Sequence, residues 1–168
     1  MAEIELPSVP VLTVSALARQ HGLDLTRFAY LICGDRDRAE DLVQDALLAM
    51  HRRFGAELRA DDPLAYARRA IVNANISWSR RSVRRELPTD DVPDRVTDFV
   101  APEDDLWNLL QTLGKRPRAV IVMRYYLGYP DADIAEVLGC RRTTVRSIAA
   151  RALAELRGRL NAHPEELS

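Results

Sequence analysis

The sequence predicts an all-α protein made of two small helical domains joined by an acidic linker. Apolar residues recur at helical spacing along most of the 168 residues, and no run of alternating β-branched residues indicates a strand. A segment with three prolines and clustered acids, residues 86–102, separates two helical halves. Glycines stand where helices are expected to end, in positions suited to left-handed C-caps. These are Gly34, Gly55, Gly114, Gly128 and Gly139.

The helical periods place three helices in the first domain, residues 14–85, and four in the second, residues 103–161. Each predicted helix begins or ends near a glycine, a proline or a break in the apolar period. The predicted helices span residues 14–33, 36–54, 63–85, 103–113, 117–127, 131–138 and 142–160. In the second domain Trp107, Tyr125 and Tyr126 are expected in the core, because they fall at helical spacing.

The charge is nearly balanced overall but strongly segregated along the chain. A net charge of −1 argues against a general nucleic-acid binder. Residues 66–85 nevertheless hold six arginines and no acid, and residues 86–105 hold eight acids. Lys115 is the only lysine, and arginine suits bidentate contacts with phosphate and guanine. Genomic base composition explains the same arginine preference equally well.

Other sequence features limit the function classes. The N-terminus shows no signal pattern and no window is apolar enough to span a bilayer, so we expect a cytoplasmic protein without membrane insertion. Cys33 and Cys140 lack metal-ligand or disulfide spacing and are expected to be small core residues. The histidines are scattered and no glycine-rich phosphate loop is present. We therefore expect no catalytic residues, no metal and no cofactor, and an enzyme is the least favoured class.

The last two predicted helices form a helix-turn-helix pattern. "DADIAEVLGCRRTTVRSI" carries a short amphipathic helix, a turn at Gly139 and a second helix. Helical spacing turns one set of residues to the core, namely Val145, Ile148, Ala149, Ala152, Leu156 and Leu160. Thr143, Arg146, Ser147, Ala150 and Arg151 remain outward, where short side chains let a helix enter a major groove. An ordinary helical hairpin with a solvated arginine face is the alternative.

Two further helix faces are candidates for binding. On the basic helix, Ala67, Ala70, Ile71, Ala74 and Trp78 form a core stripe. A different side of that helix lines up Arg69, Asn73, Ser77, Arg80 and Arg84. Asparagine between arginines suits unpaired bases, although a charged face is more often simply solvated. In "AEDLVQDALLAMHRRF" the outward residues are Asp41, Gln44, Asp45 and Leu48, an acidic stripe suited to a protein partner.

The order of these segments resembles the extracytoplasmic-function (ECF, group 4) sigma-70 factors, in particular their sigma-E-like actinobacterial branch. "AEDLVQDALLAMHRRF", "PLAYARRAIVNANISW", an acidic linker and "DIAEVLGCRRTTVRSIAARALAELRGRL" carry the resemblance, which covers residues 14–160. It implies a sigma region 2-like domain at residues 14–85 and a region 4-like domain at 103–161. It also implies core RNA polymerase, through its β′ clamp helices and β flap, and promoter DNA as partners, with an anti-sigma factor as a further candidate.

The resemblance also assigns roles to residues. Asp41, Gln44 and Asp45, with Leu48 in the same stripe, would bind core polymerase. Asn73, with Arg69 beside it, would read the −10 element, and residues 54–66 would form the loop that captures a flipped base. The −35 element would be contacted by Arg146, Ser147 and Arg151, with Arg141, Arg142, Thr143 and Thr144 at the helix start. The linker would thread toward the active-site cleft.

Departures from the family pattern leave the promoter sequence open. Ile148 stands where relatives often carry an arginine, so one phosphate contact is expected to be missing. Arg142 and Thr143 replace a small residue and a glycine. Two other functions remain alternatives: a stand-alone dimeric helix-turn-helix regulator, and a helical adaptor that binds only protein. We expect the free chain to bind DNA weakly, and the polymerase-docked chain to bind through two weak modules at once.

Overall fold

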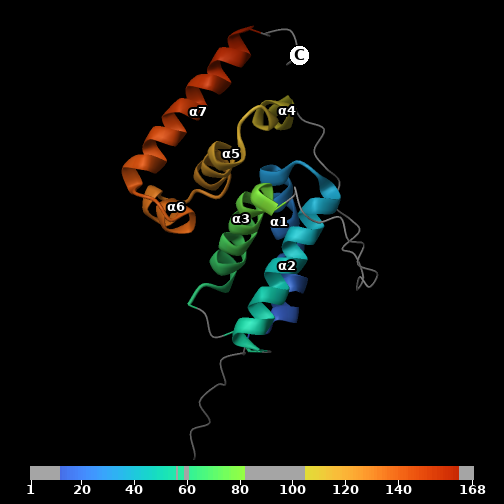
Figure 1. Ribbon diagram of the computed structural model, residues 1–168. Coiled ribbons are helices and arrows are strands. Elements are labelled where there is room, and N and C mark those ends of the chain that lie inside the picture. The colour runs from blue at the N-terminus through green and yellow to red at the C-terminus, as the bar shows by residue number, and fades with distance from the viewer. Residues whose placement is uncertain (1–11, 56, 59–60, 82–104, 163–168) are drawn as a thin grey trace, which may run out of the picture.

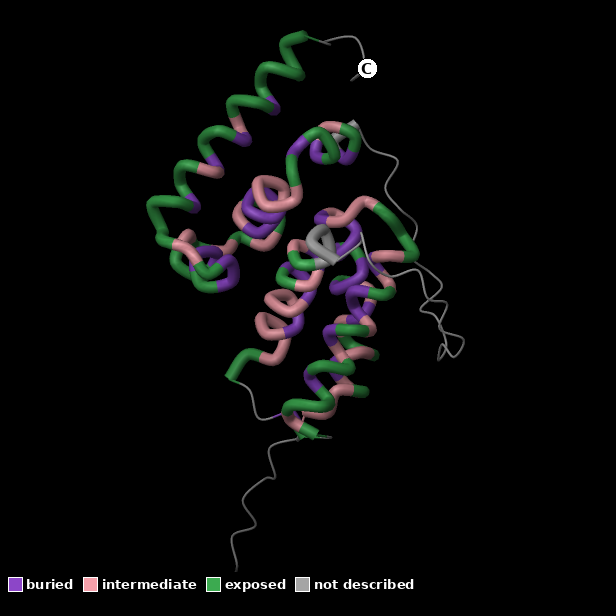
Figure 2. Tube along the Cα trace, viewed as in Figure 1, coloured by how far each residue is buried: buried purple, intermediate pink, exposed green. Residues whose placement is uncertain are grey.

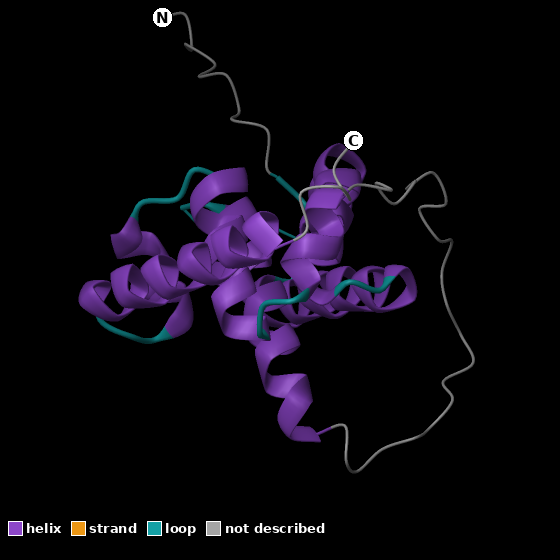
Figure 3. Cartoon of the chain, turned by 90° about the horizontal axis from the view of Figure 1, so that it is seen from above, coloured by secondary structure: helices purple, strands orange, loops and turns teal. Residues whose placement is uncertain are grey.

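The computed structural model describes residues 12–55, 57–58, 61–81 and 105–162, and it is built from helices (Figure 1). Figure 3 shows helices and loops and no strand in this described part. An isolated antiparallel bridge joins Thr13 to Glu57. The N-terminal half contains α1 (Val14–Cys33), α2 (Arg36–Phe54) and α3 (Pro63–Arg81). The C-terminal half contains α4 (Asp105–Gln111), α5 (Lys115–Ile121), the π-helix η1 (Val122–Tyr126), α6 (Asp131–Leu138) and α7 (Arg142–Ala162). The predicted all-α fold is confirmed.

Side-chain caps fix where the first three helices begin. The Thr13 hydroxyl accepts a hydrogen bond from the amide of Ala16 at 3.0 Å. The Asp35 carboxylate caps α2 by accepting from the amide of Arg38 at 2.8 Å. Asp62 accepts from the amide of Ala65 at 2.9 Å, just before Pro63 opens α3. Each cap satisfies an amide that the helix itself leaves without a partner.

The buried hydrophobic side chains form one cluster with members from both halves of the chain, and Figure 2 colours the buried residues along the trace. In the N-terminal half α1, α2 and α3 pack on one another, and in the C-terminal half α5 and α6 pack on α7. The halves also touch, through α3 with α6 and α1 with α5. These contacts define a seam between the halves, which matters below because it involves candidate functional residues.

Two expected core tyrosines are exposed, and the prediction for them is wrong. Tyr125 and Tyr126 are 58% and 53% exposed, whereas Trp107 is buried as expected. The cause is η1, in which the amide of Leu127 bonds to the carbonyl of Val122, five residues back. This wide turn shifts the following side chains out of the 3.6-residue period on which the prediction depended.

Smaller differences occur at helix ends. Leu160, expected in the core, is 36% exposed, because the C-terminal end of α7 extends past the packed part of the domain (Figure 1). Gly114 caps the N-terminus of α5 with a φ of −60°, so it is not a left-handed C-cap. Gly34 and Gly139 are left-handed C-caps as predicted, and Gly55 and Gly128 also have positive φ. Cys33 and Cys140 are half-buried at the edge of the core, not within it.

Several predictions lie outside the described residues. The backbone of α3 is described to Arg81, but nothing is described of the side chains of Trp78 and Arg80. Arg84, the linker at residues 86–102 and both chain ends are also outside the described part.

Candidate nucleic-acid interface

The outward face of α7 is as expected from helical spacing. Val145, Ala149, Ala152 and Leu156 are buried, and Ile148 lies half-buried at the core edge. Gly139 ends α6 in the left-handed conformation, so the chain can turn sharply into α7. The candidate −35 residues are all exposed along this face: Arg141, Arg142, Thr143, Thr144, Arg146, Ser147 and Arg151.

Carboxylate Asp131 connects this face to the rest of the domain. Its Oδ2 accepts from Nε of Arg146 at 3.2 Å, and its Oδ1 lies 3.5 Å from Nε of Arg124. The Asp131 side chain is only 12% exposed, whereas that of Arg146 is 62% exposed. One half-buried carboxylate therefore bridges two guanidinium groups, one of them on α7.

The second candidate face, on α3, is partly covered by the C-terminal half. Asn73 and Ser77 are exposed, but Nη2 of Arg69 lies 2.6 Å from Oε1 of Glu136 on α6. Beside it, Arg68 donates to the Tyr129 hydroxyl at 3.3 Å. The predicted −10 arginine is thus engaged by the first helix of the helix-turn-helix.

Arg118 on α5 holds the seam together through backbone carbonyls. It donates to Ile32 in the last turn of α1 at 3.3 Å, where helix carbonyls lack intrahelical partners. It also donates to three carbonyls around the end of α4, those of Leu110, Gln111 and Leu113, at 2.9 to 3.0 Å. Such charge-assisted bonds are the stronger kind in proteins.

Within the described part of α3 the buried polar residue is Asn75, which joins α3 to α1 and α2 at the Ile32 carbonyl that Arg118 also contacts. Asn75 is 0% exposed. Its amide donates to the carbonyl of Ile32 at 3.2 Å and its Oδ1 accepts from Arg38 at 3.3 Å. The two asparagines of "VNAN" therefore have opposite settings, since Asn73 is exposed and Asn75 is structural.

Aromatic packing completes the seam. The ring centroids of Tyr30 and Trp107 lie 4.7 Å apart. Gly34 has a φ of +81°, and a Cβ built on it would stand 2.6 Å from the Trp107 ring. Burial raises the pKa of the neighbouring Cys33 thiol above its ordinary value, although a backbone hydrogen bond at Asp35 and the charge of Arg38 oppose the shift.

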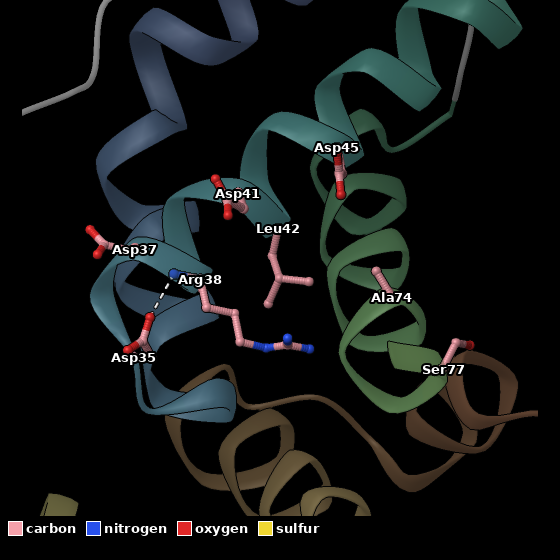
Figure 4. Close-up of a pocket in the computed structure, with 8 residues that line it drawn as sticks. All are labelled: Asp35, Asp37, Arg38, Asp41, Leu42, Asp45, Ala74 and Ser77. Atoms are coloured by element: carbon pink, nitrogen blue, oxygen red, sulfur yellow. Dashed lines mark hydrogen bonds between the residues drawn. The ribbon is translucent and has the colours of Figure 1, made fainter. Parts of the chain in front are cut away.

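The acidic stripe of α2 borders a pocket of about 700 Å³ between α2 and α3 (Figure 4). Asp41 and Asp45 line it from α2 and Ser77 lines it from α3, with Leu42 and Ala74 as apolar wall. Leu48 in the same stripe is 51% exposed, and Gln44 is half-buried. The predicted polymerase-binding stripe and the predicted −10 face thus meet at one pocket.

Sequence reasoning missed the carboxylates and the seam. Nothing in the spacing marks Asp131 or Glu136 as partners of arginines on other helices. Asn75 did carry a signal, because it follows the buried Ile71 by four residues and so shares its inward face. Arg118 stands among the arginines of α5 without any distinguishing pattern.

The described residues contain no group of three or more histidine, cysteine or acidic side chains placed to hold a metal ion. Within the same part of the chain, no helix is both long and apolar enough to cross a bilayer.

The fold and these faces define a helical DNA-recognition protein with a helix-turn-helix in its C-terminal half. Family models for sigma-70 region 2 and sigma-70 region 4 match residues 17–85 and 103–156. The chain belongs to the sigma-70 family, in its ECF group.

Curated relatives agree with this family. The RNA polymerase sigma-E factor of Streptomyces avermitilis is 34% identical over 142 residues, covering 81% of this chain and 78% of that one. The ECF sigma factor SigM of Mycobacterium tuberculosis is 35% identical over 153 residues, covering 86% and 77%.

Two solved structures are similar in fold. The sigma factor RpoE of Bartonella quintana, crystallised with the anti-sigma factor NepR, gives a TM-score of 0.64 at 22% identity and covers 86% of this chain and 96% of that one. CnrH, in complex with the cytosolic domain of CnrY, gives 0.59 at 23% identity, covering 89% and 88%.

Proposed function

We propose that this chain is a sigma factor that binds core RNA polymerase and directs promoter-specific transcription initiation. The observation that carries the proposal is the pair of arginine-bearing helix faces, on α3 and α7, within a chain of the sigma-70 family. The protein acts in the cytoplasm as a DNA-recognition subunit, without catalysis and without a metal or cofactor of its own. Melting of the promoter is driven by capture of unpaired bases.

The α7 face recognises the −35 element. Its exposed arginines and short polar side chains fit a major groove, where arginine makes its commonest specific contact with guanine. The residues assigned to this role are Arg141, Arg142, Thr143, Thr144, Arg146, Ser147 and Arg151.

The α3 face captures the non-template strand of the −10 element. Asn73 is exposed, and its amide can both donate to and accept from a base edge. Arg69 contributes only after its ion pair with Glu136 opens, so promoter binding requires the two halves to separate at that point. The residues assigned here are Arg69, Asn73, Ser77, Arg80 and Arg84.

The α2 stripe binds core polymerase. Exposed carboxylates beside an apolar residue suit a basic helical partner, and the pocket in Figure 4 offers a recess for one of its side chains. The residues assigned are Asp41, Gln44, Asp45 and Leu48, which would meet the β′ clamp helices, while the C-terminal half meets the β flap.

The division of labour follows the two matched regions. Residues 14–85 serve the −10 element and polymerase, residues 103–161 serve the −35 element, and 86–102 connect them as an acidic linker. The sigma factor RpoE was crystallised with the anti-sigma factor NepR, and the structure of CnrH contains the cytosolic domain of CnrY. Because both are similar in fold to this chain, an anti-sigma factor is a further candidate partner.

The test is transcription by purified core RNA polymerase on fragmented genomic DNA, with and without the protein, with RNA 5′ ends mapped. We expect new start sites that share two upstream elements. Asn73→Ala and Arg146→Ala should each abolish dependence on one element. Asn108→Ala and Arg19→Ala, which change exposed residues on α4 and α1, away from both faces, serve as matched controls.

Absence of new starts would overturn the proposal. If the protein alone then protected a palindromic site, a dimeric helix-turn-helix regulator would replace it.

A further inference from the structure

Arg146, an exposed arginine of the candidate DNA-binding face on α7, is held in place by its own domain. Nε of Arg146 donates to Oδ2 of Asp131 at 3.2 Å, while its side chain is 62% exposed. Its two terminal amino groups have no hydrogen-bond partner within the described part of the chain. The contact thus restrains the guanidinium by one edge and leaves the other edge available.

Asp131 is itself restrained, so it can act as a fixed support. It is the first residue of α6 and its side chain is 12% exposed. Its second oxygen lies 3.5 Å from Nε of Arg124 in η1, and the guanidinium carbon of Arg124 lies 5.8 Å from the Tyr125 ring centroid. A short side chain pinned from two sides has little freedom left to lose on DNA binding.

We propose that Asp131 is a positioning residue for −35 recognition, which fixes Arg146 so that its terminal amino groups meet a pair of acceptors on the DNA. The acceptors are the O6 and N7 atoms of a guanine or two oxygens of a phosphate, which share the same bidentate chemistry. The inference rests on the proposed function and adds a residue that does not itself touch DNA.

The physical reason is preorganisation. A free arginine side chain loses conformational freedom about several rotatable bonds when it binds, and this loss of entropy lowers the affinity. A carboxylate that orders Arg146 beforehand removes part of that loss, as supporting contacts do in other recognition sites.

Electrostatics alone predicts the opposite sign. Removal of Asp131 takes one negative charge away from a DNA-binding face, and more positive faces bind DNA more tightly. A weaker complex after removal of Asp131 therefore separates positioning from simple charge.

The experiment uses holoenzyme and a promoter mapped in the transcription assay above, with single-base variants of its −35 element. We expect Asp131→Ala to lower initiation from the mapped promoter by about fivefold to tenfold, part of what a bidentate contact contributes. Asp131→Asn keeps an acceptor oxygen, so its level of initiation should lie between those of the wild type and Asp131→Ala. In an Arg146→Ala background, Asp131→Ala should cause no further loss.

The −35 variants and a salt series identify the acceptor. If Asp131→Ala no longer discriminates between the bases at one position of the −35 element, Arg146 contacts a guanine there. If its base discrimination is unchanged and the slope of log affinity against log salt is shallower by about 0.9, Arg146 contacts a phosphate. Either result supports the proposal.

Asp133→Ala is the matched control, because Asp133 is an exposed acid in the same first turn of α6. Thermal unfolding of each variant checks that folding is unchanged, and Asp131→Asn retains the test if the alanine variant is unstable. Equal initiation by the Asp131→Ala and Asp133→Ala variants, or higher initiation by Asp131→Ala than by the wild type, overturns the proposal. The proposed function still stands in that case if the wild-type holoenzyme initiates transcription. Failure of wild-type holoenzyme to initiate overturns both.

Discussion

Arg69 on α3 and Arg146 on α7 both belong to candidate DNA-binding faces, and both pair with carboxylates of the same short helix, α6. The two pairs differ in setting. Glu136 reaches Arg69 across the seam, with side-chain exposures of 68% and 41%. Asp131 holds Arg146 within one domain and is only 12% exposed.

The difference shows that an arginine–carboxylate pair can either hinder or favour DNA binding by its arginine. An exposed pair between two halves competes with DNA for its arginine, because the carboxylate occupies the group that a phosphate or base would meet. A nearly buried carboxylate in the same domain supports its arginine and leaves its outer edge free. If these arginines face the promoter as proposed, helix α6 masks one of them and prepares the other, and each prediction below tests a part of that contrast.

The largest expected effect comes from disturbing the seam that brings Glu136 to Arg69. Gly34→Ala should lower the free energy of unfolding by about 2–5 kcal/mol. Alanine is strained in the left-handed conformation of this residue, and its Cβ would also clash with the Trp107 ring. Gly139→Ala meets nothing within 4 Å, so it should cost only the strain, about 1–2 kcal/mol. Denaturant unfolding measures both, and equal losses would show that the Trp107 contact yields without cost.

A second seam prediction concerns Arg118. Arg118→Met removes a charged donor from four carbonyls. The Ile32 carbonyl keeps its bond from Asn75 and the Leu110 carbonyl keeps its bond from the Leu113 amide, so we expect a loss of about 2–4 kcal/mol. Arg116→Met is the control, because Arg116 donates to a single carbonyl, that of Leu138 at 3.3 Å. A loss no greater than that of the control in the same unfolding experiment would contradict the role assigned to Arg118.

The fold and the exposed faces could be predicted because both depend on local periodicity. The first two helices, Val14–Cys33 and Arg36–Phe54, have the predicted bounds, since each begins at a capping residue and ends before a glycine. The exposure of Asn73 and Arg146 likewise follows from helical spacing. Even Asn75 could have been placed inside by the same rule.

Tertiary pairing and the π-helix could not be predicted in this way. No sequence pattern distinguishes Glu136 and Asp131 from solvent-exposed acids, and their partners depend on how α6 packs against α3 and α7. Tyr125 was misplaced because a single wide turn changes the period without a residue type that marks it. What the sequence lacked was the arrangement that makes one arginine masked and the other supported.

A smaller effect is expected from pH at the seam. Burial raises the pKa of the Cys33 thiol, so the folded chain resists an ionisation that the unfolded chain undergoes near pH 8.5. The stability that this group contributes is present below that pH and is lost as pH rises through the folded pKa. Unfolding measured from pH 7 to 10 should show a decline that is shallower in Cys33→Ala, with both proteins compared in a Lys115→Met background, because burial lowers the pKa of Lys115 while the charge of Cys33 raises it. Parallel curves would contradict the assignment.

The smallest expected effect is also the sharpest test of the contrast on α6. Glu136→Gln removes an exposed ion pair worth about 0.2–1 kcal/mol, so the free protein should bind a single-stranded −10 oligonucleotide up to about fivefold more tightly. Fluorescence anisotropy measures this, with Glu155→Gln as control, since Glu155 pairs with Arg159 on the same helix at 3.5 Å. Because salt screens the exposed pair, the gain in affinity should shrink as ionic strength rises.

Glu136→Gln and Asp131→Ala each remove one negative charge from α6, so charge alone would change DNA binding in the same direction in both variants. Opposite changes in binding would require that Glu136 masks an arginine and Asp131 supports one.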